Sequence, residues 1–201
     1  MYELICVSNR HIFYDTFGRS ASFENRIRRI LSCGIGVILR EKDMGEDEYY
    51  ALLRAIGDSR VTAHTFAGAA RRFGCRSVHL PLSVLRDTDV SDIEYVGSSV
   101  HSAAEAAEAE ALGASRITAG HVFATDCKKG LKPRGTDFIA GVAAAVKIPV
   151  YAIGGISPDN AQETVKAGAA GVCVMSGFMR CEDPKAYADM FKGHKPGPEH
   201  I

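Results

Sequence analysis

The chain has 201 residues, and its 24 lysines and arginines balance its 24 aspartates and glutamates, so the formal net charge is zero. Nucleic acids and anionic membrane surfaces need a basic partner, so we expect neither to bind this chain. No apolar run is long enough to span a bilayer, and residues 1–20 lack the apolar centre of a secretory signal. The six cysteines are scattered without metal-ligand spacing, so we expect a cytoplasmic protein with reduced thiols and no metal site.

Eight short runs along the chain are rich in apolar and β-branched residues and read as strands. Several are almost entirely apolar, which is typical of parallel strands that other elements cover on both faces. In chain order the expected strands are Glu3–Val7, Gly36–Arg40, Arg60–Ala63, Ser77–Leu80, Tyr95–Ser99, Arg116–Gly120, Val150–Ile153 and Gly171–Val174.

Segments of helical periodicity lie between these strands. They are Phe23–Cys33, Glu46–Ile56, Ala103–Leu112, Asp137–Ala145, Pro158–Ala167 and Asp183–Phe191. The stretch Leu82–Asp92 predicts only a turn or a short helix. Ser157 is a candidate N-cap for the helix that Pro158 would start, and Pro184 suits the first turn of the last helix.

Strands and helices alternate along the whole chain. Eight such units, of roughly 25 residues each, predict a (β/α)8 TIM barrel, a fold whose typical length is about 250 residues. We expect a single α/β barrel domain over residues 1–192 and a flexible tail over residues 193–201, where glycine, proline and polar residues dominate. An open, doubly wound parallel sheet is the alternative.

Glycines follow the last two expected strands, in AIGGISPDN at 152–160 and VMSGF at 174–178. Phosphate sites of TIM barrels are commonly built from these two loops, because glycine lets backbone N–H groups approach an anion. We therefore expect Gly154, Gly155, Ser176 and Gly177 to bind a substrate phosphate. The alternative is a tight turn between strand and helix that binds no ligand.

Charged side chains end the second expected strand, where ILREKD covers residues 38–43. The guanidinium of Arg40 and the ammonium of Lys42 would lie near the mouth of the barrel, where they suit a carboxylate or a phosphate. In the alternative interpretation, Arg40 pairs with Glu41 or Asp43 in a solvated cluster.

The segment GHVFATDCKKGLKPRG at residues 120–135 gathers reactive side chains just after the sixth expected strand. Imidazole exchanges protons near neutral pH, which makes His121 the candidate acid/base group, with a structural or capping histidine as the alternative. Cys127 is a rival, since Lys128 and Lys129 would favour its thiolate, although a buried and inert thiol is the simpler interpretation. Thr125 and Lys128 are candidate substrate contacts.

These motifs together resemble the thiamine phosphate synthase superfamily and, within it, the TenI group of thiazole tautomerases. The resemblance is carried by LREKD at 39–43, VHLP at 78–81, SSVHS at 98–102, the 120–135 segment, AIGGISPDN at 152–160 and GAAGVCVMSGF at 168–178. It implies a homodimeric enzyme of thiamin biosynthesis with a small phosphorylated thiazole as substrate. Synthases couple a pyrimidine pyrophosphate to a thiazole phosphate with Mg²⁺, whereas tautomerases shift a proton on a carboxylated thiazole phosphate and make its ring aromatic.

Departures from the synthase pattern separate these two branches. Synthases usually carry Asn-Asp after the third strand, where the aspartate binds magnesium, but this chain has His64-Thr65. A second acidic ligand follows the fourth strand in synthases, whereas VHLPLS offers no carboxylate before Asp87. Ile38 stands where synthases have glutamine, and His121 matches the tautomerases. We therefore expect a cofactor-independent tautomerase, an isomerase. The Mg²⁺-dependent synthase, a transferase, is the alternative, and a non-catalytic phosphate-metabolite binder is the second.

In the expected mechanism, His121 removes the ring proton next to the substrate carboxylate and returns it to the exocyclic carbon. The resemblance implies this role, whereas we infer from charge that Arg40 receives the carboxylate, with Lys128 as a further cation. Ser99 and His101 match a Ser-x-His motif that contacts pyrophosphate in synthases, so the resemblance makes both of them candidate substrate contacts.

Overall fold

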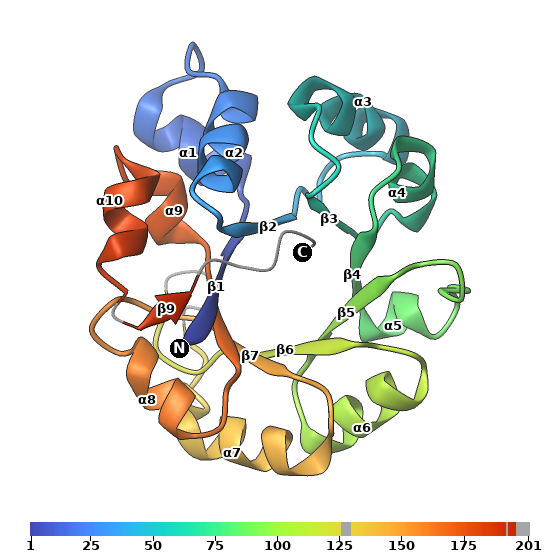
Figure 1. The fold of residues 1–201 in the computed structure, drawn as a ribbon, viewed down its shortest axis with the longest axis vertical. Helices are drawn as coiled ribbons and strands as arrows, with labels where there is room; N and C mark the ends of the chain where they lie inside the picture. Colours follow the sequence, from blue (N-terminus) through green and yellow to red (C-terminus); the bar gives the residue numbers. More distant parts are fainter. Residues whose placement is uncertain (126–129, 192, 196–201) are drawn as a thin grey trace.

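Eight parallel strands close into a barrel in the computed structural model, which describes residues 1–125, 130–191 and 193–195. The strands are β1 (Tyr2–Val7), β2 (Gly36–Leu39), β3 (Thr62–His64), β4 (Ser77–Pro81), β5 (Tyr95–Val100), β6 (Arg116–Gly120), β7 (Val150–Ile153) and β8 (Gly171–Val174). Each strand pairs with its neighbour in the chain, and β1 pairs with both β2 and β8. This closed ring confirms the expected (β/α)8 TIM barrel and excludes the open sheet (Figure 1).

The first strand closes the ring. In the register of the sheet, Ile5 lies opposite Gly36 of β2, and Leu4 lies opposite Val172 of β8. A short strand, β9 (His194–Lys195), extends the sheet beyond β1 by pairing with its first residues. The backbone of residues 194–195, which we assigned to the tail, is thus paired with the barrel.

Ten helices are present in the part of the chain that the structure describes, and they surround the barrel (Figure 1). They are α1 (Arg10–Phe17), α2 (Phe23–Ser32), α3 (Glu46–Ile56), α4 (Ala67–Phe73), α5 (Leu82–Leu85), α6 (Ala103–Ala111), α7 (Gly135–Ala145), α8 (Ala161–Lys166), α9 (Ser176–Arg180) and α10 (Pro184–Asp189). Helices α1, α4 and α9 were not expected from the sequence. Pro184 starts α10 as expected. Within the described ranges, no helix has the length and apolar character needed to cross a membrane.

Helix α8 begins at Ala161, so the prediction that Pro158 starts it and Ser157 caps it was wrong. The side chain of Asn160 accepts a hydrogen bond from the backbone N–H of Ser157 at 2.8 Å and donates one to the carbonyl of Gly155 at 2.9 Å. Asparagine often closes a turn by bonding to nearby backbone groups in this way. Pro158 therefore lies in a turn that precedes the helix.

The helices bury apolar stripes against the outside of the barrel. In α2 the buried residues include Ile27, Ile30 and Leu31, and their spacing of three and four places them on one face. The helix begins where Ser22 accepts a hydrogen bond from the N–H of Asn25 at 3.1 Å. A fixed helix start and a single apolar face together determine which way α2 packs.

The interior of the barrel is divided into two halves of different chemistry. Side chains alternate between the faces of a strand, so every second residue points inward. Strands β7, β8, β1 and β2 contribute a mainly apolar half, which contains Tyr151, Ile153, Cys173, Ile5, Val7 and Ile38. Glu3 of β1 also lies in this half and accepts a hydrogen bond from the Tyr151 hydroxyl at 2.6 Å. Strands β3 to β6 contribute a polar half, which contains Thr62, His64, Ser77, His79, Ser99, Arg116 and Thr118.

Candidate active site

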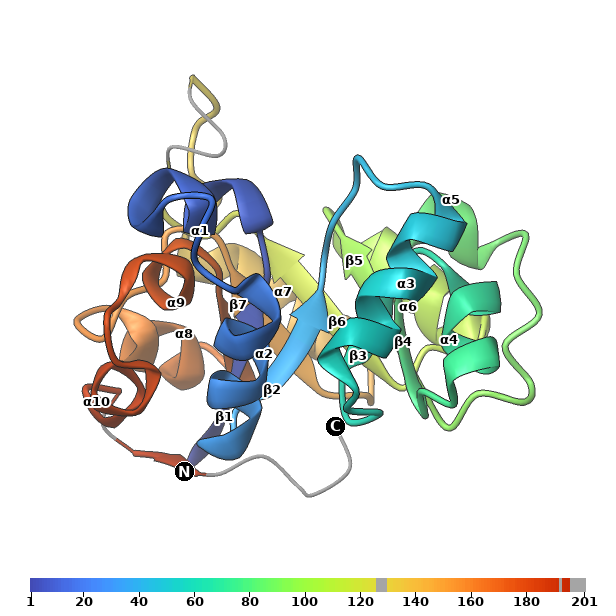
Figure 2. The same cartoon turned by 90° about the horizontal axis from the view of Figure 1, so that it is seen from above.

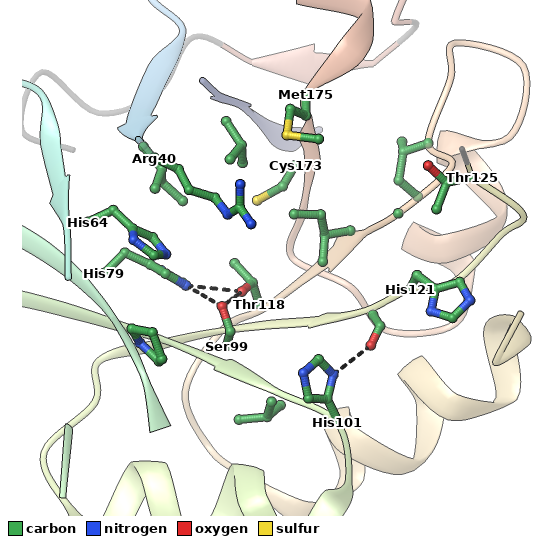
Figure 3. A pocket seen from close by; sticks show the side chains of 18 of the residues that line it. Arg40, His64, His79, Ser99, His101, Thr118, His121, Thr125, Cys173 and Met175 are labelled. Carbon is green, nitrogen blue, oxygen red and sulfur yellow. Dashed lines mark hydrogen bonds between the residues drawn. The ribbon is translucent and has the colours of Figure 1, made fainter. Parts of the chain in front are cut away.

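A cavity of about 500 Å³ lies at the carboxyl ends of the strands, and residues of all eight barrel strands line it. This end of the barrel carries α1 and lies opposite the N-terminus (Figure 2). The cavity brings together most of the residues expected in the site, namely Arg40, Lys42, Ser99, His101, His121, Thr125, Gly154, Gly155 and Ser176 (Figure 3). Lys128 and its neighbour Cys127 lie outside the described residues.

Gly177 is the expected phosphate contact that does not line this cavity. A Cβ atom at Gly177 would overlap the hydroxyl group of Tyr187 in α10. Glycine is therefore required here for the packing of α9 against α10. Its neighbour Ser176, the first residue of α9, lies in the cavity wall beside the loop that follows β7.

The cations at the end of β2 line the cavity, while the neighbouring carboxylates point elsewhere. Glu41 is buried and accepts hydrogen bonds from the hydroxyl of Ser8 at 2.6 Å and from the backbone N–H of Arg10 at 3.1 Å. Asp43 binds the guanidinium of Arg10 at 2.6 and 2.7 Å. Both carboxylates considered as alternative partners of Arg40 are therefore engaged by Arg10.

Two stacked histidines occupy the polar half, His64 at the end of β3 and His79 within β4. The rings of His64 and His79 lie 5.7 Å apart with an angle of 20° between their planes. Burial, with the nearby charges of Arg40 and Lys42, lowers the pKa of His64 to about 3. Burial also lowers the pKa of His79 well below its ordinary value. Both imidazoles are therefore neutral at physiological pH.

Thr65 holds the first of these rings from the exit of β3. Its hydroxyl lies 2.7 Å from His64 Nδ1, and its backbone has a φ of 69°. Positive φ is rare for a β-branched residue, and such conformations concentrate at functional sites. The backbone N–H of Thr65 donates to the carbonyl of His79 at 3.0 Å, which ties this residue to β4.

Three polar side chains meet at the cavity floor, where β4, β5 and β6 lie side by side (Figure 3). The Nε2 atom of His79 lies 2.8 Å from the hydroxyl oxygen of Ser99 and 3.2 Å from that of Thr118. The two hydroxyl oxygens lie 3.1 Å apart. A ligand that reaches the floor would therefore meet a connected group of polar atoms.

His101 stands at the exit of β5 and contacts the end of β6. Its Nδ1 atom lies 3.0 Å from the carbonyl oxygen of Gly120, the residue before His121. A carbonyl can only accept, so Nδ1 carries the hydrogen and Nε2 remains as the second exchangeable site of this ring. The backbone N–H of His101 donates to Glu105, the first-turn carboxylate of α6, at 2.5 Å.

The loop that carries His121 lies directly on the glycine pair after β7. The N–H groups of Val122 and Phe123 donate to the carbonyls of Ile153 and Gly154, at 3.0 and 2.9 Å. A Cβ atom at Gly154, whose φ is 99°, would overlap the Cα and Cβ atoms of His121. The glycine therefore lets the two loops approach closely, which is a structural requirement independent of any phosphate.

His121 itself is half-buried and lines the cavity. The peptide bond that joins it to Gly120 is cis. Its Nε2 atom lies 3.4 Å from the carbonyl of Leu131, a long contact at the limit of a hydrogen bond. The imidazole is therefore held mainly through its backbone, and Figure 3 shows it at the edge of the labelled group, away from His79 and Arg40.

The described residues that line the cavity do not fit a magnesium site. Mg²⁺ prefers hard oxygen ligands, usually one or two carboxylates together with substrate phosphates. In the described part of the chain, Glu105 is the single carboxylate in the cavity lining, and its Oε2 atom already accepts from a backbone N–H. The same residues form no cluster of three or more histidine, cysteine or acidic side chains suited to a metal.

Two residues of the site were missed in the sequence. Thr118 and His79 lie inside strands rather than after them, and attention to strand exits passes over both. The signal that would have found them is alternation, because Thr118 lies two residues before Gly120 and so points the same way. Arg116, two residues earlier again, belongs to the same row.

Known proteins of similar sequence share most of this chain. A thiamine-phosphate synthase of Haloarcula marismortui is 35% identical over 179 residues, which are 81% of this chain and 84% of that protein. A thiamine-phosphate synthase of Syntrophomonas wolfei is 31% identical over 196 residues, 90% of each chain. The structure of a thiamine phosphate pyrophosphorylase from Pyrococcus furiosus superposes with a TM-score of 0.75 at 26% identity, covering 95% of this chain and 94% of that one.

The TMP-TENI family model, described as thiamine monophosphate synthase, matches residues 4–178. That range contains every residue of the site described above, from the cations after β2 to Ser176. The chain therefore belongs to the thiamine monophosphate synthase family.

Proposed function

We propose that this protein is an enzyme of thiamin biosynthesis that aromatises a carboxylated thiazole phosphate by moving one proton. Membership of the family supports the substrate class, a phosphorylated thiazole. The choice of reaction depends on one observation. At the exits of β3 and β4, where a synthase would present magnesium ligands, this chain has His64-Thr65 and Pro81-Leu82-Ser83, and neither stretch includes a carboxylate.

These residues cannot replace two carboxylates around Mg²⁺, because the imidazole of His64 offers nitrogen and Mg²⁺ binds oxygen in preference to nitrogen. Proton transfer needs no metal, but it does need an imidazole or a carboxylate within reach of the ring. His121 meets that need because it lines the cavity and its loop is fixed on Gly154 by backbone bonding. The histidine removes the ring proton and returns it to the exocyclic carbon.

The remaining groups of the cavity bind the substrate. The loops after β7 and β8 receive the phosphate through backbone groups near Gly154, Gly155 and Ser176. Arg40 receives the carboxylate, since its planar guanidinium can hold both oxygens. The phosphate and carboxylate then hold the thiazole ring between them, with one face toward His121.

The experiment is to supply the non-aromatic thiazole tautomer to purified protein and follow aromatisation by ultraviolet absorbance. We expect wild-type protein to accelerate the reaction and the His121→Ala variant to lose roughly 10²–10⁴-fold in rate, the usual contribution of a positioned acid/base group. The matched control is His11→Ala, which removes an exposed histidine of α1 outside the cavity. Equal rates for His121→Ala and wild type would contradict the role of His121.

The second candidate function is thiamine phosphate synthesis, and the names of the relatives from Haloarcula marismortui and Syntrophomonas wolfei favour it. Incubation with a pyrimidine pyrophosphate, a thiazole phosphate and Mg²⁺ tests it directly. Metal-dependent formation of thiamin phosphate would replace our first proposal. If the protein binds a thiazole phosphate but performs neither reaction, it is a metabolite-binding protein.

A further inference from the structure

Three buried side-chain polar atoms lack hydrogen-bond partners among the residues that the structure describes. One is the hydroxyl of Tyr2, at the start of β1, and the other two lie in the polar half of the barrel. They are Nδ1 of His79 and Nε of Arg116. Buried polar atoms are almost always bonded, so an unpaired one needs an explanation. Here the two atoms face the same position in the polar half.

Gly97 of β5 creates the space in which they meet. A Cβ atom at Gly97 would overlap His79 Nδ1 and would lie 3.2 Å from Arg116 Nε. Strands β4 and β6 flank β5, so the two side chains approach each other across the glycine. Any larger residue at this position would separate them.

Other contacts fix the guanidinium of Arg116 in place. The side chain is buried, and its terminal nitrogen donates to the hydroxyls of Thr62 at 2.9 Å and Ser77 at 2.6 Å. An arginine nitrogen can donate but cannot accept. The face that Arg116 turns toward His79 is therefore both cationic and an N–H donor.

A neutral imidazole carries one hydrogen, on either Nδ1 or Nε2. A hydrogen on Nδ1 would point toward the N–H group and charge of Arg116 and would have no acceptor. A lone pair on Nδ1 faces the same group favourably. The surroundings of His79 therefore favour the form with its hydrogen on Nε2.

The choice between these two forms sets the polarity of the cavity floor. With hydrogen on Nε2, His79 donates to Ser99, the Ser99 hydroxyl donates to Thr118, and the Thr118 hydroxyl has a hydrogen to offer the cavity. With hydrogen on Nδ1, Thr118 donates to Ser99 and Ser99 donates to Nε2. In that arrangement the floor presents only lone pairs, and Thr118 could donate to a ligand only by giving up its hydrogen bond to Ser99.

We propose that Arg116 is a positioning residue, which holds His79 with its hydrogen on Nε2 so that Thr118 donates a hydrogen bond to an anionic oxygen of the ligand. The carboxylate of the thiazole substrate is that anion, and this part of the proposal rests on the proposed function. The position of the hydrogen on His79 does not depend on it, because both partners are already present in the protein.

The hydrogen is located by long-range ¹H–¹⁵N NMR of labelled protein, with the His79 signals identified by their loss in His79→Gln. We expect a bare Nδ1 and a protonated Nε2 in wild type. A hydrogen on Nδ1, or an even mixture, would overturn the proposal. In Arg116→Met we expect the Nδ1-protonated form to increase. Ser77→Ala, which removes one anchor of Arg116, is a milder second variant, and no change in either folded variant would also contradict the proposal.

Thr118→Val tests the ligand end through binding measured by calorimetry. We expect this variant to bind a thiazole phosphate carboxylate roughly ten- to hundredfold more weakly, as for the loss of a hydrogen bond to a charged group. Its affinity for a thiazole phosphate without the carboxylate should be unchanged. The matched control is Thr164→Val, a buried threonine in α8 outside the cavity. An equal loss of affinity for both ligands would show that Thr118 does not bind the carboxylate.

These readouts separate the new proposal from the proposed function. Neither requires turnover, so a protein that fails to aromatise the thiazole can still show the expected hydrogen on His79 and the expected loss of binding. If wild type binds neither ligand, the proposed function fails, and the NMR result alone decides the role of Arg116.

Discussion

The two halves of the barrel interior perform different tasks. The apolar half, from β7, β8, β1 and β2, fills its space with Ile5, Val7, Ile38 and their neighbours, as an ordinary protein core does. The polar half, from β3 to β6, instead contains bonded hydroxyls, two histidines and a buried arginine. A cavity that is apolar on one side and hydrogen-bonding on the other can hold a flat heterocycle in one orientation.

The largest expected difference between the halves is in their response to a fall in pH, because among the described residues of the barrel interior the imidazoles belong to the polar half. Burial lowers the pKa of folded His64 to about 3, whereas an unfolded histidine titrates near 6.5. Between these values the unfolded chain binds a proton that the folded chain does not. The free energy of unfolding should therefore fall as pH drops from about 6.5, by up to about 1.4 kcal/mol per pH unit for each such histidine.

Urea unfolding between pH 7 and pH 4.5 measures this slope. His64→Gln should flatten it, whereas His101→Gln, which removes an exposed histidine of the same cavity, should not. A His64→Gln variant with the slope of wild type would show that His64 is not held neutral by the fold.

The junction between the halves should tolerate little change. Gly154 follows β7 of the apolar half and supports the His121 loop, which extends β6 of the polar half. Alanine at Gly74, with φ of 86° and no atom within 4 Å, costs only the left-handed backbone, roughly 1–2 kcal/mol. Gly154→Ala should cost roughly 1–3 kcal/mol more, because its Cβ also overlaps His121. Thermal unfolding of both variants compares them, and equal losses would show that the loops do not need this close contact.

A polar group placed in the apolar half should destabilise it. Ile5 is 1% exposed, packs among apolar side chains and does not line the cavity, so the amide of Ile5→Gln would be buried there at a cost of about 1–3 kcal/mol. Ile5→Val, which removes one methylene group, controls for lost volume at about 0.5–1.5 kcal/mol. Chemical denaturation gives both values. If the glutamine variant loses no more free energy of unfolding than the valine variant, the apolar half can provide hydrogen-bond partners for an amide.

The smallest expected effect comes from an electrostatic interaction between a residue after β2, in the apolar half, and a histidine of the polar half. The charge of Arg40 contributes to the lowered pKa of His64, after burial. In Arg40→Met the pKa of His64 should rise but should stay below its ordinary value, since burial remains. NMR titration measures the pKa of His64. The control is Lys147→Met, which removes a cation from the loop that precedes β7, at the amino end of that strand. A pKa that does not move would place the guanidinium too far away to interact.

The sequence predicted the barrel better than it predicted the contacts inside it. All eight strands were found, and Arg116–Gly120, Val150–Ile153 and Gly171–Val174 have the expected bounds, because buried parallel strands are almost entirely apolar and short. Helix α9 was missed because its five residues include a glycine and have no helical period of their own. Packing on α10 stabilises it, which local sequence cannot reveal.

The candidate site followed the same pattern. Residues at strand exits, such as Arg40, His101 and His121, could be gathered from the barrel rule alone. The contacts of His79 with Ser99 and Thr118 depend on the register of three strands, and that register is set by the whole ring. The pairing of Glu41 with Ser8 and Arg10 joins residues about 30 positions apart, so charge pattern alone could not assign it.

The pairing of β1 with both β2 and β8 has a consequence for folding during synthesis. Its first edge can pair with β2 early, but its second edge needs residues 171–174 of β8. On the ribosome, an apolar strand edge therefore stays open until β8 has emerged, and such edges promote aggregation. Fragments that end before β8 should be poorly behaved for this reason, however many complete strand–helix units they contain.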